Sequence, residues 1–171
     1  MLSLMQWAIK LKLFRSKELD KFGEGNYMIK YAVKSDARIL AELAIQMWND
    51  NTVQDLEKEF EELIHSDDAV CFIKYVDNTE VGFAQCQIRT DYVEGTETSP
   101  VGYLEGIFVV ETYRHNGYAK ELLQECEKWA KEKKCSEFAS DCALDNIDSF
   151  KFHMAMGFEE ANRIICFKKN I

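Results

Sequence analysis

The sequence predicts a single α/β domain, on three observations. Patterns typical of strands and helices alternate along the chain from Met28 to its last residues. The 171 residues suffice for one hydrophobic core, since chains of this size bury roughly 70% of the surface that they expose when unfolded. No internal repeat, linker or low-complexity stretch divides the sequence.

The first half of this domain is predicted to begin with a strand and two helices. Residues 28–33 have the pattern of a strand, and a short polar segment then offers a cap for a helix over residues 37–48. Thr52 followed by Asp55 resembles a capping box, although Asp stands where Glu or Gln is usual. We therefore expect a second helix that continues through Ile64.

A β-hairpin is predicted next. Residues 70–76 and 81–89 are two apolar runs, and Asp77-Asn78 lies between them as a turn. A polar loop over residues 90–100 then leads to an apolar strand and a helix, around which the chain is organised.

The C-terminal part is predicted to contain three more elements, after a helix that ends near Lys133. They are a strand over residues 137–141, a helix over residues 146–156 and a final strand over residues 163–168.

The charge of the chain bears on its partners. A formal net charge of −9 argues against a nucleic-acid ligand and favours cationic small molecules. Much of the acid is concentrated in one region, at Asp50, Asp55, Glu57, Glu59, Glu61, Glu62, Asp67 and Asp68. This region is interpreted either as the solvated face of a helix or as a wall that attracts a polycation.

Six cysteines show no metal-ligand spacing, and the sequence predicts no bound metal. They are Cys71, Cys86, Cys126, Cys135, Cys142 and Cys166. Reduced, buried thiols in a cytoplasmic protein are the simplest account. Cys142 follows Asp141, whose charge would raise the thiol pKa, so a structural role is favoured over that of a nucleophile.

Residues 1–27 are expected to form an extension outside the domain. Their first part is apolar and basic, but Lys10 and Lys12 interrupt it and no small-residue cleavage site follows, so it is neither a membrane span nor a signal peptide. Residues 23–25 would have purine-rich codons, as in a bacterial ribosome-binding site, and one hypothesis is that the native protein starts at Met28. The alternative is an amphipathic helix that lies on the domain or on a membrane surface.

The organising stretch runs over residues 103–123. An apolar strand at 107–110 is followed by the turn Arg114-x-x-Gly117-x-Ala119 and an amphipathic helix. Small residues let the backbone approach a ligand, and the free N–H groups and dipole of a helix start attract anions. The pattern indicates a phosphate site, although an ordinary strand-to-helix connection can look the same.

This stretch resembles the acetyl-CoA pyrophosphate loop of the GCN5-related N-acetyltransferases (GNAT). A second match runs from Asn146 to Phe158 and is similar to the second CoA motif of that family, with Ser149 in place of an alanine. Residues 92–106 and 137–141 are similar to one subgroup, the aminoglycoside 6'-N-acetyltransferases. The resemblance covers the chain from Met28 to its C-terminus.

The resemblance implies the fold in more detail. The domain over residues 28–171 should have an α+β, GNAT-like fold within the α/β class, with a central mixed, mostly antiparallel sheet. That sheet should splay between its fourth and fifth strands and be flanked by about four helices. A homodimer, with exchange of C-terminal strands between its subunits, is also expected.

The resemblance further implies that acetyl-CoA is the co-substrate and that no metal takes part. A backbone N–H near Ile107 would hold the oxyanion during direct attack in a ternary complex. The expected cofactor-binding residues are Ile107, Phe108, Val109, Arg114, His115, Asn116, Gly117, Tyr118, Ala119 and Asn146.

Catalysis needs a group that takes a proton from the attacking amine, whose pKa is roughly 10 when unperturbed. The resemblance points to Glu105 and Asp141, which stand in or at the end of apolar strands, where a charge is costly without a partner. The alternative is that both carboxylates cap backbone N–H groups. His153 stands where many relatives carry a tyrosine that protonates the thiolate, and it either takes that role or packs beside CoA.

The resemblance also implies residues that bind the acceptor. Trp48 would stack on a sugar ring, although a core position is equally expected for it. Tyr92 and Glu94 would join Glu105 and Asp141 in the wall of the acceptor site, with Glu97 in the same loop. Without the resemblance, this loop would be interpreted as an ordinary polar connection.

The sequence therefore predicts an aminoglycoside 6'-N-acetyltransferase that confers antibiotic resistance. One alternative is an acetyltransferase for another small polycation, such as a polyamine or an amino sugar. Another is a non-catalytic module that binds acyl-CoA, which would be favoured if Glu105 and Asp141 were paired internally and closed to solvent. No nucleic acid and no membrane are expected as partners.

Overall fold

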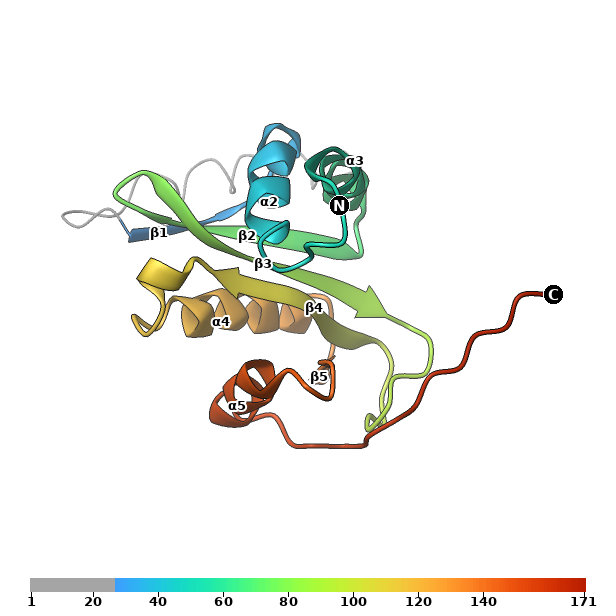
Figure 1. Ribbon diagram of the computed structural model, residues 1–171. Helices are drawn as coiled ribbons and strands as arrows, with labels where there is room; N and C mark the ends of the chain where they lie inside the picture. Colours follow the sequence, from blue (N-terminus) through green and yellow to red (C-terminus); the bar gives the residue numbers. More distant parts are fainter. Residues whose placement is uncertain (1–26) are drawn as a thin grey trace, which may run out of the picture.

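The computed structural model describes residues 27–171, which form one open sheet with helices on both faces (Figure 1). The expectations for residues 1–26 fall outside this described part. In chain order the elements are β1 (Tyr27–Tyr31), α2 (Ala37–Ala44), α3 (Val53–His65), β2 (Ala69–Val76), β3 (Thr79–Arg89), β4 (Val101–Val109), α4 (Tyr118–Glu132), β5 (Glu137–Ser140) and α5 (Ile147–Ala155).

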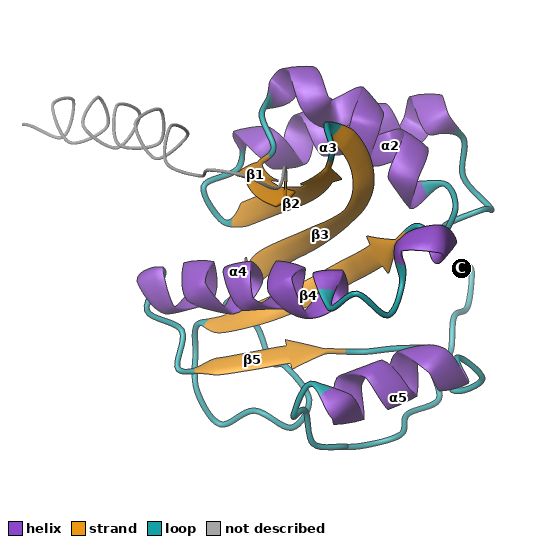
Figure 2. Cartoon of the chain, turned by 90° about the vertical axis from the view of Figure 1, so that its left-hand side faces the viewer, coloured by secondary structure: helices purple, strands orange, loops and turns teal. Residues whose placement is uncertain are grey.

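The five strands lie in the sheet in their order along the chain, from β1 to β5. Neighbouring strands are antiparallel, except that β4 and β5 are parallel. Their pairing runs from Val101 opposite Glu137 to Leu104 opposite Ser140, whereas β4 continues to Val109. Beyond this last pair the two strands diverge (Figure 2), which confirms the predicted splay between the fourth and fifth strands.

Two hydrophobic clusters hold the helices on the sheet. Helices α2 and α3 cover one face, where Leu40, Leu56 and Phe60 pack on Ile73 and Phe83 (Figure 1). Helix α4 covers the other face through a second cluster, against which part of α5 packs. Burying a large apolar side chain contributes about 1.5–3 kcal/mol, so these two layers fix the positions of β3 and β4 between them.

Local sequence signals account for the start of α3 and for the turn between β2 and β3. Thr52 caps α3, because its hydroxyl oxygen accepts a hydrogen bond from the backbone N–H of Asp55 at 3.2 Å. The predicted hairpin turn is confirmed: Asp77 and Asn78 have φ angles of 49° and 63°. Two successive left-handed residues match the twist of a two-residue hairpin, and Asp and Asn tolerate that conformation.

Two predicted elements differ in the structure. The helix expected over residues 37–48 ends at Ala44 and continues only as turns. The final strand expected over residues 163–168 was wrong for this chain, because these residues are exposed and form no strand (Figure 1). A strand needs a neighbouring strand to accept its backbone hydrogen bonds, and no described segment lies beside this one as a strand.

The six cysteines are divided between the core and the surface. All six are free, and Cys71, Cys86, Cys126 and Cys135 are buried as expected. Cys142 is only partly buried and Cys166 is exposed, so the expectation of buried thiols was wrong for Cys166, which lies in the segment that forms no strand. Burial raises the pKa of the Cys71 thiol to about 12.

Among residues 27–171, no helix has the length and apolar composition that crossing a membrane requires.

Candidate active site

Glu105 lies at an irregularity in the middle of β4. Gln85 of β3 pairs with Gly106, and the next residue, Cys86, pairs with Leu104, so Glu105 is the extra residue of a β-bulge. A bulge turns the side chains of its strand out of the regular alternation. The carboxylate therefore interrupts an otherwise apolar strand where the backbone is locally distorted.

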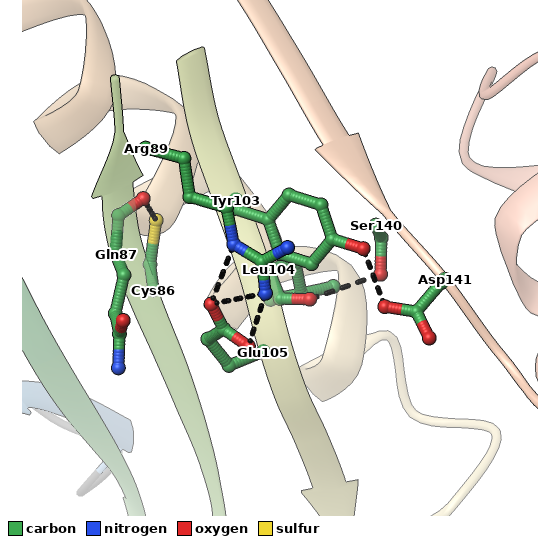
Figure 3. Close-up of polar contacts among 8 residues, drawn as sticks. All are labelled: Cys86, Gln87, Arg89, Tyr103, Leu104, Glu105, Ser140 and Asp141. Atoms are coloured by element: carbon green, nitrogen blue, oxygen red, sulfur yellow. Dashed lines mark hydrogen bonds and ion pairs between the residues drawn. The ribbon is translucent and has the colours of Figure 1, made fainter. Parts of the chain in front are cut away.

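Arg89, the last residue of β3, is paired with this carboxylate (Figure 3). Its Nη2 lies 2.9 Å from Oε1 and 3.0 Å from Oε2 of Glu105, and its Nε lies 3.1 Å from Oε1. The guanidinium carbon is also 3.3 Å from the centre of the Tyr103 ring. Arg89 thus holds Glu105 through three charge-assisted hydrogen bonds while it stacks on an aromatic face.

Tyr103 connects this pair to the second carboxylate. Its hydroxyl donates a hydrogen bond to Oδ1 of Asp141, which directly follows β5 (Figure 3). Burial, and then the bond to Asp141, raise the pKa of Tyr103 above its ordinary value, so the phenol remains a donor at neutral pH. Glu105 and Asp141 are therefore linked through Arg89 and Tyr103 without being paired with each other.

The two carboxylates differ in their exposure. The side chain of Glu105 is 21% exposed, and Arg89 already binds both of its oxygens. Asp141 is exposed, and among the described residues only Tyr103 donates a hydrogen bond to it. A non-catalytic module that binds acyl-CoA would be favoured if both acids were paired internally and closed to solvent. The structure meets this condition only in part, since Asp141 is exposed to solvent.

Trp48 lies beside Glu105. Its ring packs so closely over Gly106 that a Cβ added to Gly106 would lie 2.8 Å from Trp48 Cζ2. A pocket of about 290 Å³ opens here between α3 and the sheet, and its lining includes Trp48, Glu59, Gln85 and Glu105. Trp48 is half-buried, so its ring both contributes to the core and forms part of the pocket wall.

The loop over residues 90–100 is held against the sheet at two points. Val93 packs with Val101 and Tyr103, which places the exposed residues Tyr92 and Glu94 on either side of an anchor next to the Tyr103 ring. At the other point, the Glu137 carboxylate accepts hydrogen bonds from the N–H groups of Glu97 and Thr98 and from the Thr98 hydroxyl.

Tyr92 and Glu94 do not themselves contact the central carboxylates. The Tyr92 hydroxyl donates to Oε2 of Glu94 at 2.9 Å, and Oε1 accepts from Nδ2 of Asn162 at 2.8 Å. The pKa of Glu94 is lowered by the bond from Asn162 and then by that from Tyr92. This pair therefore lies where the loop meets the C-terminal segment, at the border of the site.

The turn between β4 and α4 has the geometry of an anion site. His115 has a φ angle of 63°, and Gly117, the N-cap of α4, has a φ angle of 83°. A Cβ added to Gly117 would meet nothing within 4 Å, so the space beside it is open. Within residues 27–171, no hydrogen bond occupies the backbone N–H groups of His115, Asn116 and Gly117. Free donors at the start of a fifteen-residue helix favour a phosphate group.

Side chains brace this turn. Arg114 Nε donates to the carbonyl of Val109 at 3.0 Å, and Asn116 Nδ2 donates to the carbonyls of Tyr113 and Arg114 at 3.1 Å each. Tyr118 and Ala119 begin α4 and pack against the core. Ile107, Phe108 and Val109 belong to the part of β4 that extends beyond its pairing with β5.

The second predicted motif lies on α5. Asn146 is its N-cap, with Oδ1 accepting from the N–H of Ser149 at 3.0 Å. His153, one turn further, bonds to the Ser149 carbonyl through Nδ1 at 2.7 Å and to the Ser140 hydroxyl through Nε2 at 3.0 Å. Both nitrogens of the expected proton donor are therefore engaged within the protein.

Metal chemistry was not expected. Of the residues that the structure describes, no three His, Cys, Asp or Glu side chains converge in a way that could hold a metal ion. The chemical groups gathered at the splay of β4 and β5 are instead two carboxylates, a guanidinium, a phenol, a hydroxyl and an imidazole.

Comparison with known proteins agrees with this arrangement. The family model of the Acetyltransferase (GNAT) family matches residues 38–158. The chain belongs to the GNAT family. The match includes the β4–α4 turn, both carboxylates and all of α5, so these features lie within the matched region.

Individual GNAT proteins resemble the chain over most of its length. It is 39% identical over 143 residues to the aminoglycoside N(6')-acetyltransferase type 1 of Acinetobacter haemolyticus, a match that covers 84% of this chain and 98% of that protein. The structure of the aminoglycoside N-acetyltransferase AAC(6')-Iy in complex with CoA aligns with a TM-score of 0.83 and 36% identity, over 87% of this chain and 98% of that one. AAC(6')-Iy bound to a bisubstrate analogue, CoA-S-monomethyl-acetylneamine, aligns with a TM-score of 0.81 and 36% identity, over 85% and 99%.

Several residues of this GNAT site were missed by the sequence analysis: Arg89, Tyr103, Glu137 and Ser140. Tyr103 could have been found, because it precedes Glu105 by two residues in a strand and such residues share a face. Arg89 could not, because its contact with Glu105 depends on the register of β3 on β4 and on the bulge between them.

Proposed function

We propose that the protein transfers an acetyl group from acetyl-CoA to the 6'-amine of aminoglycoside antibiotics and so confers resistance. The observation that carries this proposal is the pair of carboxylates, Glu105 and Asp141, where β4 and β5 separate. A relative that is 39% identical has the name of such an enzyme. A structural relative that is 36% identical holds an analogue that joins CoA to an aminoglycoside fragment.

The turn between β4 and α4 supports acetyl-CoA as the co-substrate. The N–H groups of residues 115–117 would bind its pyrophosphate, and the unpaired part of β4 would lie along its pantetheine arm. Acetyl-CoA supplies a thioester, whose carbonyl carbon accepts the amine. A backbone N–H near Ile107 would stabilise the negative oxygen that develops during attack.

Asp141 is the better placed of the two acids to accept the proton of the amine. Its Oδ2 makes no hydrogen bond with any described residue, and the side chain is exposed. Both oxygens of Glu105 are bound by Arg89, so Glu105 would orient the ammonium group as a fixed negative charge. Asp141 would remove the proton directly or through one water molecule.

The surroundings of the two acids suit a cationic, ring-shaped acceptor. Trp48 offers an aromatic face next to Glu105, and Glu59 adds a further acid to the same pocket. Tyr92 and Glu94 would extend this wall along the loop. The net charge of −9 attracts a polycation from a distance.

Thiol release from acetyl-CoA tests the proposal, with kanamycin, tobramycin, spermidine and glucosamine offered separately to the purified protein. We expect release with the two aminoglycosides and a mass gain of one acetyl group at the 6' nitrogen. Turnover with spermidine or glucosamine alone would assign the enzyme to another polycation. No thiol release with any of the four amines would favour a module that binds acyl-CoA without turnover.

Variants of the two acids make the test specific. Glu105→Gln combined with Asp141→Asn removes both charges and preserves the shape of the side chains. We expect transfer to be abolished while the affinity for CoA, measured by calorimetry, is nearly unchanged, because neither acid forms a hydrogen bond with the β4–α4 turn. Unchanged turnover in this variant would remove both acids from the mechanism.

We further propose that the protein works in the cytoplasm as a homodimer. Six free cysteines suit a reducing compartment. The C-terminal segment leaves Ile165 78% and Phe167 93% exposed, and β5 is an edge strand in the described part of the chain. Exchange of residues 163–168 between two copies, as a strand beside β5 of the other copy, would bury these side chains and extend the sheet.

A further inference from the structure

Ser140 lies at the point where β4 and β5 separate. It is the last residue of β5 and pairs with Leu104, the last β4 residue opposite β5. Its hydroxyl donates a hydrogen bond to the Leu104 carbonyl oxygen at 3.0 Å (Figure 3). The Ser140 hydroxyl oxygen also lies 3.0 Å from Nε2 of His153 on α5. One hydroxyl thus connects both strands of the splay to the second predicted motif.

Ser140 and Asp141 serve opposite faces of the sheet. Neighbouring residues of a strand alternate in direction, and the packing of β5 follows this rule: Phe138 contacts the core beneath α4, whereas Ala139 contacts the cluster of Val93, Val101 and Tyr103. Asp141 accordingly bonds to Tyr103 on the acceptor side, and Ser140 bonds to His153 on the α5 side. The proton of the attacking amine and the proton for the leaving group can therefore be handled by different residues, Asp141 and Ser140.

The hydrogen bonds around Ser140 define where protons can reside. A carbonyl oxygen only accepts, so the bond to the Ser149 carbonyl requires a proton on Nδ1 of His153. The Leu104 carbonyl likewise requires the single proton of the Ser140 hydroxyl. Nε2 must then donate to Ser140, and the chain of bonds Nε2–H to Oγ–H to the Leu104 carbonyl is complete only when His153 is an imidazolium. A neutral ring has to accept from Ser140, which takes the hydroxyl proton away from Leu104.

We propose that Ser140, not His153, hands the proton to the departing thiolate of CoA, and that His153 replaces it. This inference rests on the function proposed above. As the C–N bond forms and the C–S bond breaks, the proton on Ser140 Oγ moves to the sulfur and the Nε2 proton of His153 moves to Oγ. His153 is left neutral and is recharged from solvent, and the proton lost by the amine leaves separately on the Asp141 side.

The His153 ring is surrounded by aromatic side chains and two serines. The ring is half-buried and stands edge-on to Phe152 and Phe158, with centroids 5.5 and 5.0 Å away. Its polar neighbours are Ser149 on its own helix and Ser140 on β5. Among residues 27–171, no acidic side chain forms a hydrogen bond or ion pair with His153, so Ser140 is the side chain through which the ring connects to β5.

Steady-state kinetics with acetyl-CoA and the best acceptor amine test this assignment. Ser140→Ala removes the hydroxyl, Ser140→Thr retains it and serves as the matched control, and His153→Gln removes the source of the proton. We expect S140A and H153Q each to lower kcat by about 100-fold, with the KM for acetyl-CoA unchanged, and S140T to retain most of the activity. Because the two groups act in series, the double variant should be no slower than either single one.

A second readout does not depend on turnover. The chain contains three histidines, so ¹⁵N-histidine labelling gives few signals, and H153Q identifies those of His153. The Nε2 chemical shift reports whether this nitrogen carries a proton and what it bonds to. We expect S140A to move this signal at neutral pH in the free protein, whereas S140T leaves it near the wild-type position.

The outcomes separate the two proposals. If wild-type protein acetylates only a non-aminoglycoside amine, the proposed substrate is wrong and the relay is measured with that amine. Wild-type kcat in S140A would overturn the relay, as would an Nε2 signal that S140A does not move. Losses that multiply in the double variant would show that His153 acts on the thiolate independently of Ser140.

Discussion

Arg89 binds Glu105 through three hydrogen bonds of 2.9 to 3.1 Å, so the acid at the centre of the site is paired with a positively charged side chain. The guanidinium is pinned by the Tyr103 ring on which it stacks. A carboxylate held in this way keeps one orientation, and fixed charges cost little reorganisation when the reacting groups arrive. The pair therefore serves to position Glu105.

Removal of this cation should slow the reaction. In Arg89→Ala we expect kcat/KM for the acceptor to fall by about 10-fold or more, while unfolding stability changes by only about 1 kcal/mol because the pair is partly exposed. Arg38→Ala is the matched control, since Arg38 binds Glu42 and Glu57 on the helical layer instead. Acceptor kinetics of R89A equal to those of R38A would show that Glu105 needs no partner.

Gly106 should tolerate no side chain. Its added Cβ would lie 2.8 Å from Trp48 Cζ2 and 3.0 Å from Met47 Cε, so Gly106→Ala must move the indole or the strand. Overpacking of this kind costs about 1–3 kcal/mol, measurable by urea unfolding, and displacement of Trp48 should raise the KM of the acceptor. Trp48→Phe in the same background has a smaller ring and should restore part of the lost stability. A G106A protein as stable as wild type would mean that Trp48 moves away freely.

The features predicted from sequence are those whose signal is local. Asp77-Asn78 specifies its turn through two residues that tolerate positive φ, and Gly117 specifies the open turn before α4 in the same way. Family resemblance supplied the acids, Glu105 and Asp141, and the splay between their strands. The hairpin turn and the splay are confirmed by the structure, whereas the assignment of the two acids to the site remains a prediction.

The features that were missed depend on contacts between distant residues. Arg89 reaches Glu105 across sixteen positions of sequence, and Ser140 reaches Leu104 across thirty-six. Such pairs follow from strand register and from the bulge at Glu105, which one sequence does not display. The strand expected over residues 163–168 failed for a related reason: its pattern is apolar, but a strand forms only beside a partner.

Glu137 should make the stability of the loop over residues 90–100 depend on pH. The bond from the Thr98 hydroxyl lowers the pKa of Glu137 most, and burial opposes it as the second-largest effect. The N–H groups of Thr98 and Glu97 lower the pKa further, so that the pKa of Glu137 lies below its ordinary value. A lowered pKa in the folded state gives stabilisation that is fully present above the unfolded value of about 4.3 and is lost as the pH falls through the folded value.

Thermal unfolding measured between about pH 6 and about pH 3 tests this linkage. Wild-type protein should lose more of its Tm on acidification than Glu137→Gln, which cannot titrate but retains an oxygen that accepts hydrogen bonds. Glu62→Gln, at an exposed position of α3, should behave as wild type does. Parallel acid profiles for wild type and E137Q would show that the loop does not depend on the charge.

The C-terminal segment should determine the oligomeric state. Ile165 and Phe167 would lie on one face of a strand over residues 163–168, and both are more than three-quarters exposed in the single chain. Burial of each contributes about 1.5–3 kcal/mol, which a second copy can provide. Light scattering should give the mass of a dimer, twice 19.9 kDa, for the wild-type protein. The double variant Ile165→Asp/Phe167→Asp should have the mass of one chain.

Ile171→Asp is the control, because this equally exposed residue lies beyond the expected strand. It should leave the dimer intact, and the Tm of wild type and I171D should rise with protein concentration, as for any folded state stabilised by association. The I165D/F167D variant should lose that dependence while it retains the affinity for CoA, since the β4–α4 turn lies within one chain. A wild-type protein that scatters as a monomer at every concentration would leave residues 163–168 without a partner and overturn the exchange.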